Sequence, residues 1–154
     1  MVNFNLFFCS VLCVFMSNSF AAESTILGSL LFDQGAARLS FDETKAMIQP
    51  GASVEQINGS TGGIRRWTLE ADGKFIASRV AATGGSRPVT GQGEWKLTEN
   101  GQFCVQIEWR PSRGGPEQEN WCRVLYKHDG AVFLEPIDLA NTGDKKYGQI
   151  SFKR

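Results

Sequence analysis

A nine-residue pattern that occurs twice constrains the fold of this chain more than any other feature. Residues 67–75 read W-x-L-x-x-D-G-x-F, and residues 95–103 read W-x-L-x-x-N-G-x-F, 28 residues later. Residues 125–133 form a weaker third copy that keeps the Asp-Gly pair and the final Phe. Apolar residues that alternate on both sides of Asp-Gly or Asn-Gly are the strongest local signal of a β-hairpin. Three such hairpins in succession predict an antiparallel meander.

The rest of the pattern predicts an all-β domain with one short N-terminal helix. The 154 residues suffice for one domain with a real core and are too few for two ordinary domains. Eight antiparallel strands in sequence order can close into an up-and-down barrel, and an open meander or a sandwich is the alternative. The strands are expected near residues 53–57, 63–70, 74–80, 91–98, 102–109, 119–127, 131–136 and 147–153.

A capping box predicts the helix that precedes these strands. Ser40 is followed three residues later by Glu43, and the helix is expected to run to about Ile48, before Pro50. The expected organisation is therefore a leader with a short helix over residues 22–51 and a β-barrel domain over residues 52–154.

The first 21 residues have the features of an export signal. Residues 6–16 form an apolar run that is too short to span a bilayer comfortably. Ser19 and Ala21 supply small residues at positions −3 and −1 of a cleavage site after Ala21. An uncleaved membrane anchor is the alternative, because no Lys or Arg precedes the apolar run. We expect a signal peptide over residues 1–21, and a periplasmic or secreted protein.

Charge and cysteine content narrow the functional classes. Lys plus Arg and Asp plus Glu each number 16, which argues against a sequence-independent nucleic-acid binder. Signal cleavage would leave only Cys104 and Cys122, and an even number in an oxidising compartment predicts a disulfide. A hairpin centred in the turn-like stretch 111–116 would place the two directly opposite each other. A metal or redox pair is disfavoured, because neither further ligands nor a C-x-x-C spacing is present.

The apolar pattern also predicts the strand register. A three-residue hairpin loop pairs Leu97 with Phe103, whereas a two-residue loop would set apolar side chains against polar ones. Gly73 and Gly101 are then expected in the left-handed conformation, each forming a G1 bulge, with the cysteine pair on the outer face. The inner face is expected to hold Trp67, Leu69, Phe75, Trp95, Leu97, Phe103, Val105, Ile107, Trp109, Trp121 and Leu125.

The same register applied to the third hairpin gives an unusual expectation. If Lys127 pairs with Ala131, then Arg123 faces Glu135 on the inner face. A buried charge is tolerated when it is paired. We weigh two interpretations, a structural ion pair that plugs the barrel and a polar anchor in an aromatic cavity. A register error would place both charges outside.

Longer connections gather at the end of the meander opposite the tight turns, and binding residues often lie on such loops. Arginine beside tryptophan is typical of recognition surfaces, although an ordinary solvated rim over core tryptophans is the alternative. The residues expected at this end are Arg79, Arg87, Arg110 and Arg113, with Trp109 and Trp121 just inside.

No residue pattern indicates catalysis. His128 is the only histidine and falls in a predicted turn, so a nucleophile–histidine system has no base in a cleft. Phosphate-loop, zinc-protease and dinucleotide motifs do not occur. Glu94 and Glu108 are expected to point outward, unlike the convergent pair of a glycosidase. We expect no catalytic residue, no cofactor and no metal.

A group of motifs occurs together between residues 93 and 123. Its members are Gly93-Glu94-Trp95-Lys96-Leu97, Gly101-Gln102-Phe103-Cys104, Trp109 and Trp121-Cys122-Arg123. In this combination the chain resembles a family of small exported proteobacterial proteins catalogued as a domain of unknown function, over residues 45–135. The resemblance implies a lipocalin-like β-barrel and an envelope location, with no activity attached. A weaker resemblance, through G-x-W-x-L and then G-x-x-C, is to small periplasmic barrel inhibitors of metalloproteases, in which residues 22–32 would be the inhibitory segment.

Two functional hypotheses follow. In the first, the chain is an exported, non-enzymatic binding module for a small apolar or amphipathic ligand, which lies against Trp95, Trp109 and Trp121 with Arg123 and Glu135 as polar anchor. In the second, the arginine-bearing loop end or the N-terminal segment meets another envelope protein, as in a protease inhibitor. Nucleic acid and, after signal cleavage, a membrane span are not expected.

Overall fold

The described part of the chain contains eleven β-strands and two short helices. The structure is a computed structural model, which describes residues 25–59, 61–81, 87–136 and 144–154. The helices are α1 (Gly28–Asp33) and α2 (Phe41–Met47). The strands are β1 (Thr25–Leu27), β2 (Ala37–Arg38), β3 (Ser53–Ile57), β4 (Ile64–Thr68), β5 (Lys74–Val80), β6 (Val89–Leu97), β7 (Phe103–Arg110), β8 (Glu117–Arg123), β9 (Leu125–His128), β10 (Ala131–Leu134) and β11 (Lys146–Lys153).

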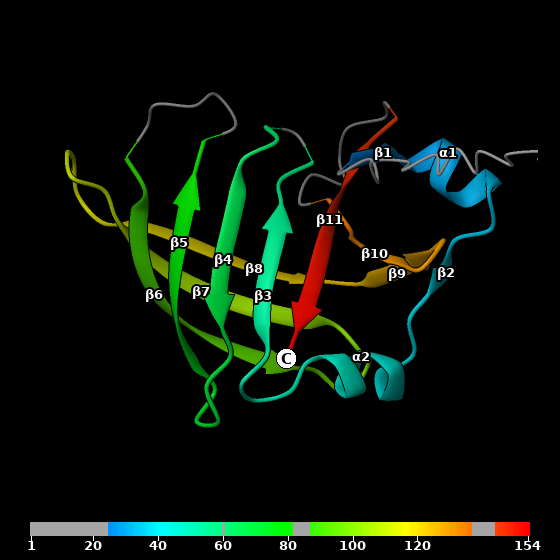
Figure 1. Cartoon of the computed structure of the whole chain (residues 1–154), viewed down its shortest axis with the longest axis horizontal. Helices are drawn as coiled ribbons and strands as arrows, with labels where there is room; N and C mark the ends of the chain where they lie inside the picture. Colours follow the sequence, from blue (N-terminus) through cyan, green and yellow to red (C-terminus); the bar gives the residue numbers. More distant parts are fainter. Residues whose placement is uncertain (1–24, 60, 82–86, 137–143) are drawn as a thin grey trace, which may run out of the picture.

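These strands form one antiparallel sheet that curls into a half-barrel (Figure 1). Its order is β2-β9-β10-β11-β3-β4-β5-β6-β7-β8, and β1 adds to β11. The pairing of β3 with β11 brings together the first and last of the strands expected from the sequence. Strands β8 and β9 are one continuous stretch broken at Val124, and they pair with β7 and β10 respectively. Figure 1 shows β8 crossing behind β5, β4 and β3, so the two halves of the curled sheet enclose an interior.

The expected number of eight strands is wrong, for identifiable reasons. The strand expected over residues 119–127 is divided at Val124, where it changes partners from β7 to β10. Strands β1 and β2 come from the leader and are too short to carry a periodic signal. Helix α1 was not expected either. Residues 25–38 of the leader therefore contribute two strands to the sheet and one helix that packs against it.

Helix α2 lies across the lower end of the half-barrel (Figure 1) and begins at the expected residue. The Ser40 side chain accepts a hydrogen bond from the Glu43 N–H, and the Glu43 carboxylate accepts one from the Ser40 N–H at 2.8 Å. This is the capping box that the sequence predicts. Leu39 and Ile48 flank the helix and are buried in the main core, so the cap fixes how α2 closes this end.

Ser40→Ala is expected to lower the free energy of unfolding by about 1 kcal/mol, because it removes the N-cap acceptor. Ser40→Thr retains the hydroxyl and is the matched control. The Ser40 N–H, and then its hydroxyl, hold the pKa of Glu43 below its ordinary value. The contribution of the cap is therefore present above the ordinary glutamate pKa and is lost as the pH falls through the lowered one. Urea denaturation of both variants measures the effect, and equal midpoints for Ala and Thr would contradict it.

The first two hairpins have the expected register, whereas the third does not. Leu97 lies opposite Phe103, and Gly73 and Gly101 have φ values of 81° and 79°. In the third hairpin, Asp129 and Gly130 have φ values of 47° and 77° and form a two-residue turn. Asp tolerates the left-handed conformation, so this copy of the pattern closes with one residue fewer in the loop. The expected pairing of Lys127 with Ala131 is wrong, because Lys127 lies opposite Val132.

The two cysteines lie opposite each other on β7 and β8 and form a disulfide. Side-chain alternation places both on the outer face, because the neighbours of Cys104 on β7, Phe103 and Val105, point into the core. Cys122 is exposed, whereas Cys104 is only 4 % exposed. The expected external staple between two neighbouring strands is therefore present.

Two apolar clusters stabilise the sheet from opposite faces. The main core fills the interior of the half-barrel and includes Trp67, Phe103 and Leu125, together with Trp109 and Trp121. A smaller cluster lies outside, where Leu31 of α1 and Ile26 of β1 pack against the outward side chains of β10 and β11. The apolar stretch of the leader therefore packs on the outer face of the domain.

Candidate binding site inside the half-barrel

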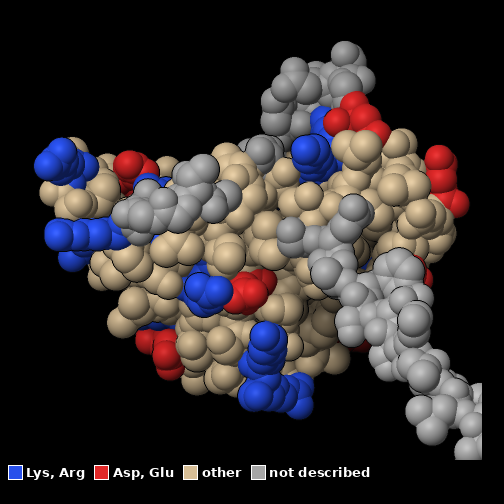
Figure 2. All heavy atoms as spheres, turned by 45° about the horizontal axis from the view of Figure 1, so that its top comes forward, with Lys and Arg blue, Asp and Glu red and all other residues tan. Residues whose placement is uncertain are grey.

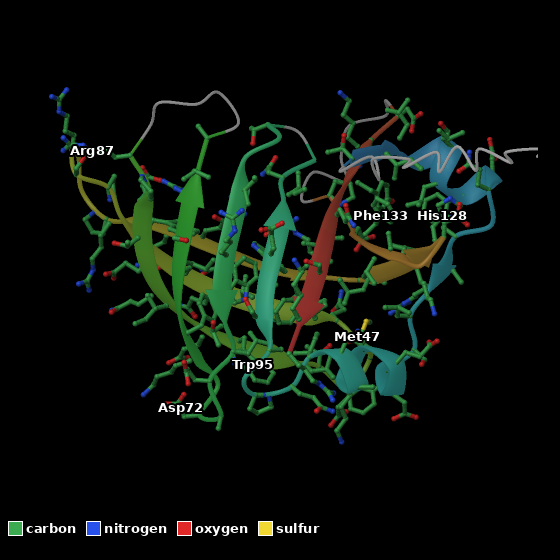
Figure 3. The ribbon with its side chains drawn as sticks, in the orientation of Figure 1. Met47, Asp72, Arg87, Trp95, His128 and Phe133 are labelled. Atoms are coloured by element: carbon green, nitrogen blue, oxygen red, sulfur yellow. A yellow bond between two sulfur atoms is a disulfide. The ribbon has the colours of Figure 1, made fainter. Side chains whose placement is uncertain are left out.

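The upper part of the interior is lined by charged side chains and tryptophans. Because side chains alternate along a strand, β8 places Glu117, Glu119, Trp121 and Arg123 on its inner face. Strands β4 and β5 contribute the inward Arg65 and Arg79 from the opposite half of the sheet, and β7 contributes Trp109. Figure 3 shows the ribbon of the described chain with its side chains as sticks.

Glu119 is the hub of this cluster. Its carboxylate accepts a hydrogen bond from Arg65 Nη1 across the interior at 2.5 Å. It also accepts one from Trp109 Nε1 at 2.9 Å and one from Trp121 Nε1 at 3.1 Å. The side chains of Arg65 and Glu119 are 13 % and 15 % exposed, so this charge pair is largely desolvated. One carboxylate therefore fixes both indole rings and joins the two halves of the sheet.

A second ion pair lies nearer the solvent. The Arg79 guanidinium donates to the Glu117 carboxylate and lies 4.7 Å from the centroid of the Trp109 ring. The Glu117 side chain is 55 % exposed and that of Arg79 26 %. This pair spans the upper edge of the interior, above the buried hub.

Arg123 differs from the other two inward arginines. It is 6 % exposed, and its guanidinium lies 4.4 Å from the centroid of the Trp121 ring. Its Nη1 donates to the Glu135 main-chain oxygen at 3.3 Å, but its Nε and Nη2 have no hydrogen-bond partner among the described residues. Burial lowers the pKa of Arg123 to about 10, so the group is still charged at neutral pH. A buried cation with two unused donors is energetically unfavourable by itself.

The expected partner of Arg123 is placed differently. The one-residue change of register sets Val124, not Arg123, beside Glu135, whose N–H donates to the Val124 carbonyl at 3.1 Å. The Glu135 carboxylate accepts from the Val124 N–H at 3.4 Å. The ion pairs formed by the described residues do not include one between Arg123 and Glu135. The expected cross-strand ion pair is therefore wrong, although Arg123 does point inward.

The expected ligand residues separate into two groups. Trp109, Trp121 and Arg123 lie together, with the main-chain oxygen of Glu135 beside them. Trp95 is at the opposite end near Asp72, where its Nε1 donates to the Glu70 carbonyl at 3.2 Å (Figure 3).

Sequence reasoning missed both partners of the buried ion pair, Arg65 and Glu119. Each lies two positions from an inward tryptophan, Trp67 in one case and Trp121 in the other. The period-two pattern that assigned the tryptophans to the inner face would have assigned both charges to it as well.

The four arginines expected together at the end with the longer loops also differ in their surroundings. Arg79 belongs to the interior, whereas Arg87 and Arg113 are exposed. Arg110 is exposed and pairs with Glu108 at 3.0 Å. Basic atoms gather at the left end of Figure 2, at the end of the molecule where Figure 3 places Arg87.

The outer face of β5–β8 carries a groove of about 870 Å³. Glu94 and Glu108 line it together with Gln92 and Gln106, so both carboxylates point outward as expected. Ile76 is 78 % exposed beside them.

Within residues 25–59, 61–81, 87–136 and 144–154, no group of three or more His, Cys, Asp or Glu side chains could hold a metal ion. No helix in the same ranges is long and apolar enough to cross a membrane.

Comparison with known proteins adds a family match without a function. A family model described as "Protein of unknown function (DUF995)" matches residues 75–137. This is in line with the expected resemblance to a domain of unknown function. The matched segment contains Trp109, Glu119, Trp121, Arg123 and the disulfide, whereas Arg65 lies outside it. No match was found among curated proteins or solved structures.

Proposed function

We propose that this chain is an exported, non-enzymatic binding module that holds a small amphipathic ligand in the upper interior of a lipocalin-like barrel. The observation that carries the proposal is Arg123, a buried and charged side chain with two unused donors beside the Trp121 ring. Unsatisfied buried polar groups are rare in native proteins, and a ligand or ion is one explanation of those that occur. Buried groups that converge beside aromatic rings are typical of ligand sites.

The surroundings of Arg123 favour a preorganised site. Glu119 holds both indole rings, so little side-chain freedom remains to be lost on binding. The more exposed Arg79–Glu117 pair lies at the upper edge, and separating it would open the interior from above. We therefore place the entrance at this pair.

Export is part of the proposal. The disulfide between Cys104 and Cys122 suits a periplasmic or secreted protein, because such bonds persist in oxidising compartments. The expected cleavage after Ala21 lies outside the described residues.

Native mass spectrometry of protein recovered from the periplasm or the medium, without detergent, tests the binding function. We expect a fraction of the molecules to carry an added mass of one small molecule, and Arg123→Met to lose it. Protein that is free of added mass and also binds no amphipathic probe would contradict the proposal.

A protein-interaction function is the second candidate, because exposed basic side chains gather at one end of the molecule (Figure 2). In this case the same experiment would recover a polypeptide bound to the chain, and Arg87→Ser with Arg113→Ser would release it. For an inhibitory N-terminal segment the placement is unfavourable, since β1 pairs with β11 and α1 packs on the outer face.

A further inference from the structure

We infer that Arg123 presents a fork for a single carboxylate, so that the ligand of the proposed site is a monoanionic carboxylic acid with an apolar body. The inference rests on the proposed binding function and adds the chemistry of the ligand. Nε and Nη2, the two donors without a partner, lie on the same edge of the guanidinium plane. Two parallel N–H groups on one edge match the two oxygens of a carboxylate.

The other contacts of Arg123 leave the edge formed by Nε and Nη2 available to bind an anion. Nη1 is committed to the Glu135 carbonyl, so the outer edge formed by both Nη atoms cannot bind an anion with two free donors. The ring of Trp121 lies against the guanidinium and fixes its plane. The fork is thus held in one orientation before a ligand arrives.

The charges around the site favour one negative charge rather than two. Arg65 and Arg79 are each neutralised by a glutamate across the interior. Arg123 forms no ion pair with another described residue, although the Glu135 carboxylate lies nearby. Because Glu135 already offsets part of the positive charge, a doubly charged phosphate would be less favourable here than a singly charged carboxylate.

Apolar side chains are the inner neighbours of the fork. Phe103 lies directly opposite Arg123 on β7, and its ring meets that of Trp121 edge-on, with centroids 5.8 Å apart. Leu125, two residues further along the strand, is fully buried in the main core. Because both side chains are fully buried, they would have to move apart to admit the apolar body of a ligand whose carboxylate meets Arg123.

Tryptophan fluorescence of the ligand-stripped protein provides the test. We expect octanoate to change the emission saturably, and octanol, which has the same body without the charge, to bind about tenfold more weakly or worse. Octyl phosphate is expected to bind more weakly than octanoate. Arg123→Lys keeps the charge but removes the fork, and should weaken octanoate by about tenfold. Arg66→Met is the matched control, because Arg66 points outward from β4, pairs with Glu55 at 2.7 Å and should leave affinity unchanged.

A second measurement is independent of any variant. The Nε–H resonance of Arg123 should shift downfield with octanoate and not with octanol, because only the carboxylate accepts its proton. Equal affinity for octanol, or an unchanged affinity in Arg123→Lys, would overturn the fork while leaving the binding function in place. Failure of all three probes, together with protein that carries no added mass, would overturn both.

Discussion

Glu119→Ala is expected to lower the free energy of unfolding by about 3–5 kcal/mol, the typical result of breaking a buried ion pair. The substitution removes the carboxylate that accepts hydrogen bonds from Arg65 Nη1 and from the indole N–H groups of Trp109 and Trp121. It leaves a largely buried guanidinium without its counter-charge. It also removes the contact that joins β4 to β8 across the interior.

Glu117→Ala is the matched control for this prediction. Glu117 lies two residues earlier on the same strand and face and also pairs with an arginine, but its side chain is 55 % exposed. Exposed pairs contribute about 1 kcal/mol or less. Denaturant midpoints of the two variants should therefore differ widely. Similar midpoints would mean that the hub is solvated and that the interior at this level is open to water.

Local and pairwise signals predicted much of the fold. The capping box at Ser40 and the glycines of the first two hairpins determine conformation within a few residues, and the structure has each of them. The pairing of Leu97 with Phe103 follows from keeping apolar side chains on one face. The disulfide follows from the symmetry of the two cysteines about one turn.

The errors arose where the sequence permits two local solutions. An Asp-Gly turn can close with two or three loop residues, and Asp129 adopts the left-handed conformation that the shorter turn requires. In the first hairpins an apolar mismatch excluded the shorter turn. In the third hairpin, the two turn lengths place either Val132 or Phe133 on the inner face. Both are apolar, so the apolar pattern does not distinguish the two turn lengths.

Parts of the candidate site depend on tertiary contacts. The ion pair between Arg65 and Glu119 joins strands that are not neighbours in the sheet. Its partners become identifiable only when the sheet curls. The inward direction of Arg123 was nevertheless predictable, because side-chain alternation from Trp121 determines it whatever the register of the following hairpin.

Arg123→Met is expected to have the opposite effect to Glu119→Ala. It should raise the free energy of unfolding of the ligand-free protein by about 1–4 kcal/mol. Methionine occupies a similar volume and removes a buried charge with two unused donors, while it leaves only the Glu135 carbonyl without its donor. The sign follows from the pKa, which is lowered to about 10 in the folded protein. The folded state holds this proton less tightly than the unfolded chain does, so the destabilisation is fully present below about pH 10 and is relieved only above it.

The stability difference between Arg123→Met and the original protein should therefore be constant between about pH 6 and pH 9, where Arg123 is charged in both folded and unfolded states. Chemical denaturation across this range, with protein stripped of ligand, measures it. A favourable ion pair with Glu135 would give the reverse result, because methionine would then leave the Glu135 carboxylate without its partner and destabilise the fold. If Arg123→Met is more stable but no longer carries an added mass, the buried guanidinium is kept for binding at the expense of stability, which is the trade-off expected of a ligand anchor.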